Sequence, residues 1–245
     1  MPKYCVIIPA AGKAERFGGA EKKTLAKLDG RPVFLRTIEH FVNRPDVCQK
    51  ILAVAPEDMA TVKSSYGANL GFMGVRLVEG GELRCDTIAA ALREVSQEAE
   101  YVAIHDAARP CIAPDRIDAV FAEAVKSGAA ILALPIVGTI KRVAGSNAIE
   151  ETVSRDGLYE AQTPQVFRKD ILLQAYERLD PAARAGATDD AQIVELAGHT
   201  VTVVTGDSTN IKITTRSDLT LAGAILKARP ARAAPRMGAF EEAQW

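Results

Sequence analysis

Two basic residues, Arg16 and Lys23, lie seven residues apart in a glycine-containing stretch that carries no apolar period. An apolar run at residues 5–8 (CVII) precedes them, with the length and β-branched content of a buried strand. The run ends at residues 9–12 (PAAG), whose small side chains let backbone N–H groups approach a ligand closely. Since α/β folds build phosphate sites in loops after strands, the stretch indicates a phosphate site. A βα turn with two solvated cations would explain it equally well.

This loop matches neither of the two familiar phosphate-binding motifs. Lys13, Ala14 and Glu15 stand where a Walker A loop or a GxGxxG loop would need further glycines. The loop alone therefore does not establish nucleotide binding.

Polar clusters follow the ends of several predicted strands. Asp106, in HDAARP (105–110), could hold a metal–phosphate unit, bind a ribose hydroxyl or cap the next turn. His105 could act as a catalytic base or be a structural residue. Four further clusters are unremarkable singly: PIVGTIK (135–141), AQTPQ (161–165), TDDA (188–191) and DSTNIK (207–212).

Strand-like and helix-like segments alternate through the first half of the chain, and helical patterns return near its end. This alternation predicts an α/β fold with a mostly parallel sheet flanked by helices. The expected strands cover residues 5–8, 50–55, 75–78, 101–105, 129–135, 201–204 and 210–214. The expected helices cover residues 33–42, 58–66, 87–95, 114–125, 169–179, 189–196 and 217–227.

Residues 139–159 interrupt this alternation with β-branched and polar residues around GSN (145–147), which predicts a two-stranded excursion. Because an isolated hairpin is marginal in water, we expect it to pack on another surface, such as a second subunit. From residue 228 the composition shifts to prolines and arginines without apolar period. We expect residues 1–227 to form one domain and residues 228–245 a mobile tail.

The composition narrows the function classes. The 245 residues carry a formal net charge of −1, which argues against the basic face that nucleic-acid binding requires. No apolar run approaches the ~20 residues of a membrane span, and the first residues lack a signal-peptide pattern. The four cysteines form no CxxC pair, which suits a reducing compartment. We therefore expect a cytoplasmic protein.

Taken together and in this order, the clusters resemble the 2-C-methyl-D-erythritol 4-phosphate cytidylyltransferase family of the non-mevalonate isoprenoid pathway. The resemblance spans residues 4–227 and rests on PAAGKAERFGGAEKK, GGELRCDT, HDAARP, LPIVGTIK, SRDGLYEAQTPQVF, TDDA and GDSTNIKIT. It implies a Rossmann-like nucleotidyltransferase sheet and Mg²⁺-assisted transfer of the cytidylyl group from CTP to methylerythritol phosphate. It also implies a homodimer that pairs through the 139–159 arm.

The resemblance further implies roles for individual residues. Arg16 and Lys23 match the family's transition-state cations, and Asp106 matches a residue at the ribose or the magnesium-bearing side of the nucleotide. Arg109 matches a residue that reaches the acceptor from the partner subunit. The residues that match the CTP site are Ala10, Ala11, Gly12, Gly81, Glu82, Thr87, Asp106 and Ala107. The residues that match the acceptor site are Thr139, Arg155, Thr163, Thr188, Lys212 and Arg109.

The sequence departs from the family pattern at four positions, Ala14, Lys22, Gly138 and Tyr159. Lys23 rather than Lys22 is assigned the catalytic role because its spacing from Arg16 matches the family. Gly138 stands where aspartate is usual, which leaves a ribitol-5-phosphate cytidylyltransferase as an alternative. A second alternative, of another class, is a nucleotide-binding module without turnover. Retention of both Arg16 and Lys23 argues against that module, because a pure binder needs no cations at the α-phosphate.

Overall fold

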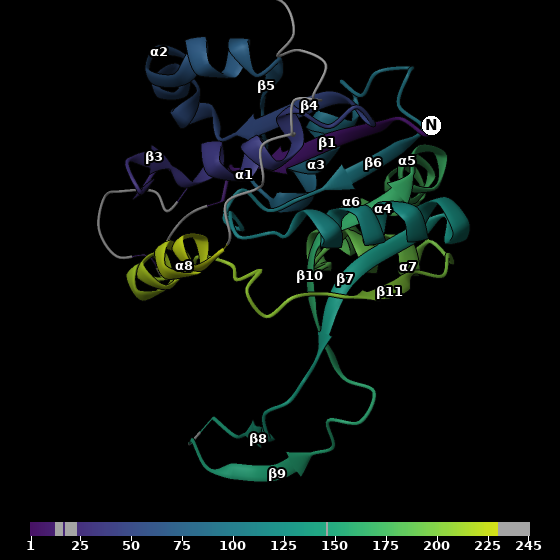
Figure 1. Ribbon diagram of the computed structural model, residues 1–245. Helices are drawn as coiled ribbons and strands as arrows, with labels where there is room; N and C mark the ends of the chain where they lie inside the picture. Colours follow the sequence, from purple (N-terminus) through teal and green to yellow (C-terminus); the bar gives the residue numbers. More distant parts are fainter. Residues whose placement is uncertain (13–16, 18–23, 146, 230–245) are drawn as a thin grey trace, which may run out of the picture.

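A seven-stranded sheet forms the centre of the protein, in the order β11-β7-β10-β6-β1-β4-β5 (Figure 1). The computed structural model describes residues 1–12, 17, 24–145 and 147–229. Neighbouring strands of the sheet are parallel except β10, which is antiparallel to both β6 and β7. The predicted mostly parallel sheet is thereby confirmed. The strands are β1 (Tyr4–Pro9), β4 (Val47–Val54), β5 (Val75–Glu79), β6 (Tyr101–Ile104), β7 (Ala129–Pro135), β10 (Tyr159–Arg168) and β11 (Thr202–Thr205).

Helices cover both faces of the sheet because its central strands are apolar on both sides. In β1, Val6 and Ile8 belong to the buried cluster on one face, and Cys5 and Ile7 to the cluster on the other. The first cluster is completed by α1 (Val33–Val42), α2 (Pro56–Phe72) and α4 (Pro114–Ser127). The second is completed by α3 (Arg84–Leu92), α5 (Lys169–Arg178) and α7 (Asp190–Leu196). This arrangement is typical of sheets built from βαβ units.

A third apolar cluster lies beside the main sheet and fixes the last helix, α8 (Arg216–Ala228). Ala222 of α8 packs in this cluster with Phe17 and Leu28. Leu28 belongs to a short ribbon formed by β2 (Lys27–Leu28) and β3 (Arg31–Pro32). A capping box starts α8, in which Thr215 accepts a hydrogen bond from the Asp218 N–H. The helix therefore begins where the sequence predicts, within one residue.

The structure contains one long strand that the sequence did not predict and lacks one that it did. Strand β10 was not predicted, because the polar residues and the proline of AQTPQ hide its apolar half. The strand expected at residues 210–214 is wrong. That segment forms no ladder and is held by the Asn210 amide, which donates to the Thr163 carbonyl, and by the Ile213 N–H, which donates to the Ala108 carbonyl.

All seven expected helices are present, with the largest differences at α3, which begins and ends three residues earlier than expected, and at α2, which is longer. Helix α2 continues to Phe72 because Tyr66 packs edge-on against Phe34 and Leu70 is buried, so apolar contacts extend past residue 66. A six-residue helix that the sequence did not predict, α6 (Pro181–Gly186), starts with the Asp180 carboxylate capping the Ala183 N–H. No helix within the described ranges is both long and apolar enough to cross a membrane.

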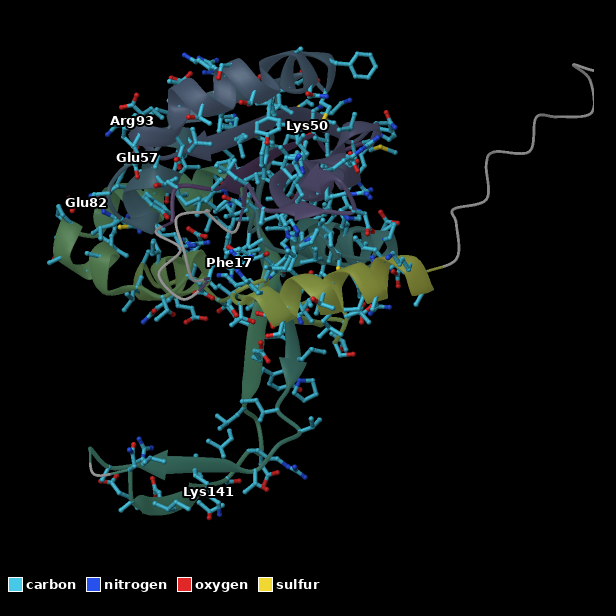
Figure 2. The ribbon with its side chains drawn as sticks, turned by 90° about the vertical axis from the view of Figure 1, so that its left-hand side faces the viewer. Phe17, Lys50, Glu57, Glu82, Arg93 and Lys141 are labelled. Carbon is cyan, nitrogen blue, oxygen red and sulfur yellow. The ribbon has the colours of Figure 1, made fainter. Side chains whose placement is uncertain are left out.

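The predicted excursion forms a separate ribbon of β8 (Ile140–Val143) and β9 (Ile149–Val153), antiparallel to each other. Figure 1 shows this arm extending away from the body, below the ends of β7 and β10. Side chains such as Val143 and Ile149 are exposed on it. Figure 2 shows Lys141 on the arm well separated from Glu82 and Phe17 on the body.

Candidate active site

One pocket opens at the carboxyl ends of the adjacent strands β1 and β6 and beside the first turn of α3. Four segments far apart in the sequence meet there: the loop after β1, the turn before α3, the loop after β6 and the segment before α8. Seven of the predicted site residues line this pocket: Ala11, Gly12, Glu82, Thr87, Asp106, Ala107 and Lys212. Five residues that the prediction did not name complete its wall: Pro9, Thr24, Leu83, Arg84 and Ala108. This is the place at which open α/β sheets bind ligands.

The glycine pair before α3 brings the backbone close to the pocket. The Gly81 N–H lies 3.2 Å from Thr87 Oγ1, and the Thr87 hydroxyl lies 3.1 Å from the Leu83 carbonyl oxygen. A Cβ atom at Gly80 would lie 2.9 Å from the Thr87 side chain, and one at Gly81 only 2.4 Å from the Asp86 Cβ. Only glycine fits either position, and the turn can therefore pack closely against α3, whose residues Arg84 and Thr87 line the pocket.

We expect Gly81→Ala to weaken nucleotide binding about tenfold or more, because the turn must move to admit the methyl group. Direct titration with CTP measures this effect. Gly71→Ala is the matched control, since no atom lies within 4 Å of a Cβ at that position. Unchanged CTP binding in Gly81→Ala would show that this turn does not contact the nucleotide.

Asp106 is a buried acid of the pocket that lies close to positively charged side chains. Its Oδ2 atom lies 2.8 Å from Lys212 Nζ and 3.5 Å from Arg109 Nε, and its side chain is 11% exposed. Burial alone would raise the pKa of Asp106, but the positive charges of Lys212, Arg84 and Arg109 outweigh it and hold the pKa well below its usual range. Asp106 is therefore ionised at every ordinary pH and orients the Lys212 ammonium.

His105 lies beneath Asp106 and does not line the pocket. The ring is fully buried, and burial lowers the pKa of His105 to about 3, so the imidazole is neutral under ordinary conditions. A buried ring that no ligand can reach cannot act as a general base. The geometry therefore supports a structural role for His105.

Arg84, which the prediction did not single out, joins two distant motifs. From the first turn of α3, its Nη2 atom contacts Asp190 Oδ2 at 2.6 Å, and the Tyr176 hydroxyl donates to Asp190 Oδ1 at 2.7 Å. Asp190 is fully buried, whereas the Arg84 side chain is 33% exposed and lines the pocket. The second aspartate of TDDA is thus the anchor of a pocket cation. The motif strings contained both residues, but spacing along the chain gave no sign of the pair.

We expect Arg84→Met to lower the free energy of unfolding by about 3 kcal/mol, because it leaves the buried Asp190 carboxylate without its cation. Arg168→Met is the control, since its ion pair with Asp170 is half exposed and should contribute less than about 1 kcal/mol. Denaturant unfolding of both variants checks the difference. Equal losses in the two variants would contradict a structural role for the buried pair.

Arg109 lies in a different place from the predicted one. Its side chain is 7% exposed and donates to the Asn210 carbonyl of its own chain at 2.7 Å. With its guanidinium committed beneath Asp106, Arg109 cannot extend to a partner subunit. The expectation that it reaches across a dimer is therefore corrected.

Four further predicted residues do not line the pocket. Ala10 and Gly81 are backbone neighbours of lining residues, and Thr163 is 5% exposed behind Asp106. Thr188 is exposed at the start of α7, where its hydroxyl lies 3.1 Å from Gln192 Oε1.

The remaining predicted residues fall into two groups. Thr139 and Arg155 are exposed at the base of the arm, where the Arg155 guanidinium donates to the Val137 carbonyl. Neither residue lines the pocket of its own chain. Arg16 and Lys23 lie outside the described residues.

The described residues include no cluster of three acidic, histidine or cysteine side chains that could hold a metal ion by themselves. This donor set still fits magnesium that arrives with a nucleotide. Magnesium is commonly held by one or two carboxylates together with substrate phosphates. Asp106 is ionised and lines the pocket, so it can supply one such carboxylate.

Comparison with known proteins gives a consistent result. A family model described as 2-C-methyl-D-erythritol 4-phosphate cytidylyltransferase matches residues 4–228. A protein of that description from Rhodopirellula baltica is 44% identical over 232 residues, which cover 90% of this chain and 93% of the relative. One from Alkaliphilus oremlandii is 41% identical over 94% of this chain and 97% of the relative.

Solved structures agree with the sequence relatives. The crystal structure of the Thermus thermophilus protein with this description superposes with a TM-score of 0.75 at 31% identity, over 92% of this chain and 99% of that one. The Francisella tularensis structure superposes with a TM-score of 0.78 at 30% identity, over 91% of this chain and 99% of that one.

Proposed function

The chain belongs to the 2-C-methyl-D-erythritol 4-phosphate cytidylyltransferase family, and we propose that its pocket transfers the cytidylyl group of CTP to methylerythritol phosphate. The products are the cytidine diphosphate derivative of methylerythritol and pyrophosphate, a step in the synthesis of isoprenoid precursors. One observation carries the proposal. Residues from four distant segments, Gly12, Thr87, Asp106 and Lys212, converge on a single pocket at the strand ends.

The end of the pocket nearest α3 suits the nucleoside. The turn at Gly80 and Gly81 packs closely against Thr87, and Glu82 and Thr87 line this end of the pocket. Gly12, which follows β1, would face the phosphates with its backbone.

The chemistry is an in-line displacement at the α-phosphorus of CTP. An oxygen of the acceptor phosphate attacks, a new P–O bond forms, and the bond to pyrophosphate breaks with its electron pair. Because both reactants are polyanions, the barrier is largely electrostatic, and cations fixed in place are the catalyst's main contribution. Lys212, held 2.8 Å from Asp106, is suited to orient the incoming phosphate.

We assign Arg16 and Lys23 to the α-phosphate as transition-state cations, on the family resemblance. The residues that flank their segment, Gly12 and Thr24, both line the pocket, which supports this assignment. Magnesium bound with CTP would supply charge neutralisation, and Asp106 is the residue that would hold it.

Thr139 and Arg155 are assigned to the acceptor site of a second copy of the chain. Both are exposed at the base of the arm and neither lines the pocket of its own chain, which supports their assignment to the pocket of a partner. The exposed Val143 and Ile149 give the arm an apolar surface that a partner would bury. A two-fold dimer would complete both sites with the same contacts.

The test is pyrophosphate release from CTP and Mg²⁺ with each polyol phosphate offered separately. We expect release with methylerythritol phosphate and much less with ribitol 5-phosphate. A preference for ribitol 5-phosphate would overturn the acceptor and retain the reaction. No release with either acceptor would indicate a binding module without turnover.

A further inference from the structure

A buried chain of hydrogen bonds lies directly behind the pocket. His105 Nε2 is 3.1 Å from the Arg109 carbonyl oxygen, and His105 Nδ1 is 3.0 Å from Thr163 Oγ1. Thr163 Oγ1 is in turn 3.0 Å from the backbone nitrogen of Asp106. Thr163 and Asp106 each lie two residues beyond Gln165 and Ile104, the last residues that pair in the antiparallel ladder of β10 and β6.

The chemistry of these groups fixes the direction of every bond in the chain. A carbonyl oxygen can only accept, so the His105 proton must be on Nε2. In a neutral ring Nδ1 then has a lone pair and accepts, which requires the Thr163 hydroxyl to donate its proton to it. The Asp106 backbone N–H can only donate, so it donates to Thr163 Oγ1.

The Thr163 hydroxyl is therefore not available to a phosphate. A phosphate oxygen needs a donor, and the one proton that Thr163 can donate is already given to His105. The hydroxyl is also buried, with Thr163 only 5% exposed. Thr163 therefore cannot hold the acceptor through a hydrogen bond that its hydroxyl donates to the phosphate.

We infer that His105 and Thr163 are positioning residues, which hold the backbone of Asp106 at the wall of the pocket. Two consecutive residues at that wall, Asp106 and Ala107, depend on this anchor, and the Asp106 carboxylate in turn orients Lys212. The inference rests on the proposed function in one respect, namely that the pocket binds CTP and the acceptor. In this assignment both residues act on the pocket through Asp106, and the buried His105 ring touches no substrate.

The first test measures the proton positions without any substrate. The chain has three histidines, so ¹⁵N-histidine labelling of the full-length protein gives three imidazole spin systems, assigned by the His40→Asn and His199→Asn variants. We expect the third, His105, to be neutral with its proton on Nε2. A proton on Nδ1, or a charged ring at neutral pH, would overturn the inference. Since no turnover is needed, failure here is distinct from failure of the proposed reaction.

The second test separates positioning from direct contact with the acceptor. Thr163→Val keeps the shape and removes the hydroxyl, so we expect CTP binding, measured without acceptor, to weaken about tenfold as Asp106 and Ala107 shift. Thr163→Ser keeps the hydroxyl and should restore binding to within about twofold of wild type. Unchanged CTP affinity in Thr163→Val, with only the KM for the acceptor raised, would show that Thr163 is a ligand of the acceptor.

A double-variant cycle tests whether His105 and Thr163 act through the same hydrogen-bond chain. His105→Leu should weaken CTP binding as Thr163→Val does, and the double variant should show little further loss, because both changes break the same chain. Additive losses would overturn the inference. If His105→Leu does not fold, as thermal unfolding would show, the Thr163 pair and the tautomer measurement decide the question.

Discussion

Lys212→Met is expected to lower kcat/KM by about 10² or more, because it removes a charge that faces the incoming phosphate in a partly desolvated pocket. The Lys212 side chain is 41% exposed and lines the pocket, and its Nζ atom lies 2.8 Å from Asp106 Oδ2, so it faces both the ligand space and the buried carboxylate. Steady-state kinetics with each substrate varied in turn measures the loss. Lys227→Met is the control, since that lysine is exposed and far from the pocket, beside Asp29.

Lys212→Met should also change the pH dependence of kcat/KM, and the charges around Asp106 determine the direction of the change. Lys212 is the strongest of the positive charges that lower the pKa of Asp106, so its removal raises that pKa. The ionised carboxylate is then lost at a higher pH on acidification, and the acid limb of the kcat/KM profile should move to higher pH. An unchanged acid limb in Lys212→Met would show that Asp106 does not control activity.

The sequence predicts the fold well where one rule governs a whole segment. The apolar run of β1 and the amphipathic period of α1 each follow from a periodicity that tertiary contacts reinforce. Strand β10 lacks such a periodicity because its first half contains the polar residues Gln162 and Thr163. Both are buried, and their polar groups form hydrogen bonds with distant segments of the chain. A local pattern cannot show that a buried polar residue has found a partner.

Local patterns likewise predict some residues of the pocket and miss others. Gly12 and Asp106 follow strands β1 and β6 and Thr87 lies in the first turn of α3, and the topology of a parallel sheet brings such ends together. Lys212 was named from its motif, and it reaches the pocket from a segment that is not a strand. Spacing along the chain does not show that Asp190 anchors a cation 106 residues away. The placement of Arg109 likewise depends on the Asn210 carbonyl, which only the folded chain brings near.

Mixing two inactive variants, Arg155→Ala and Lys212→Ala, is expected to restore activity, which is the sharpest consequence of the arm geometry. In the described structure Arg155 lies on the arm and Lys212 at the pocket of the same chain, so in a dimer each site would combine the arm of one chain with the pocket of the other. In a mixed dimer one site then holds both native groups and the other holds neither. Random pairing makes half of the dimers mixed, so activity should return to about a quarter of the wild-type value, from a parent activity about 10² lower.

The control for this mixing experiment is a pair of variants that lie in the same pocket, Lys212→Ala with Asp106→Asn. Both changes affect the pocket wall of one chain, so in a mixed dimer each site still has one defect and no activity should return. The subunits must exchange for the result to be valid, so each mixture is first unfolded and refolded together, and its mass is measured by light scattering. A monomer at working concentration, or no recovery in the Arg155→Ala and Lys212→Ala mixture, would show that Arg155 does not complete the site of a partner. Recovery only in that mixture would establish that the arm supplies Arg155 in trans, which is why a residue so far from its own pocket can still act in the reaction.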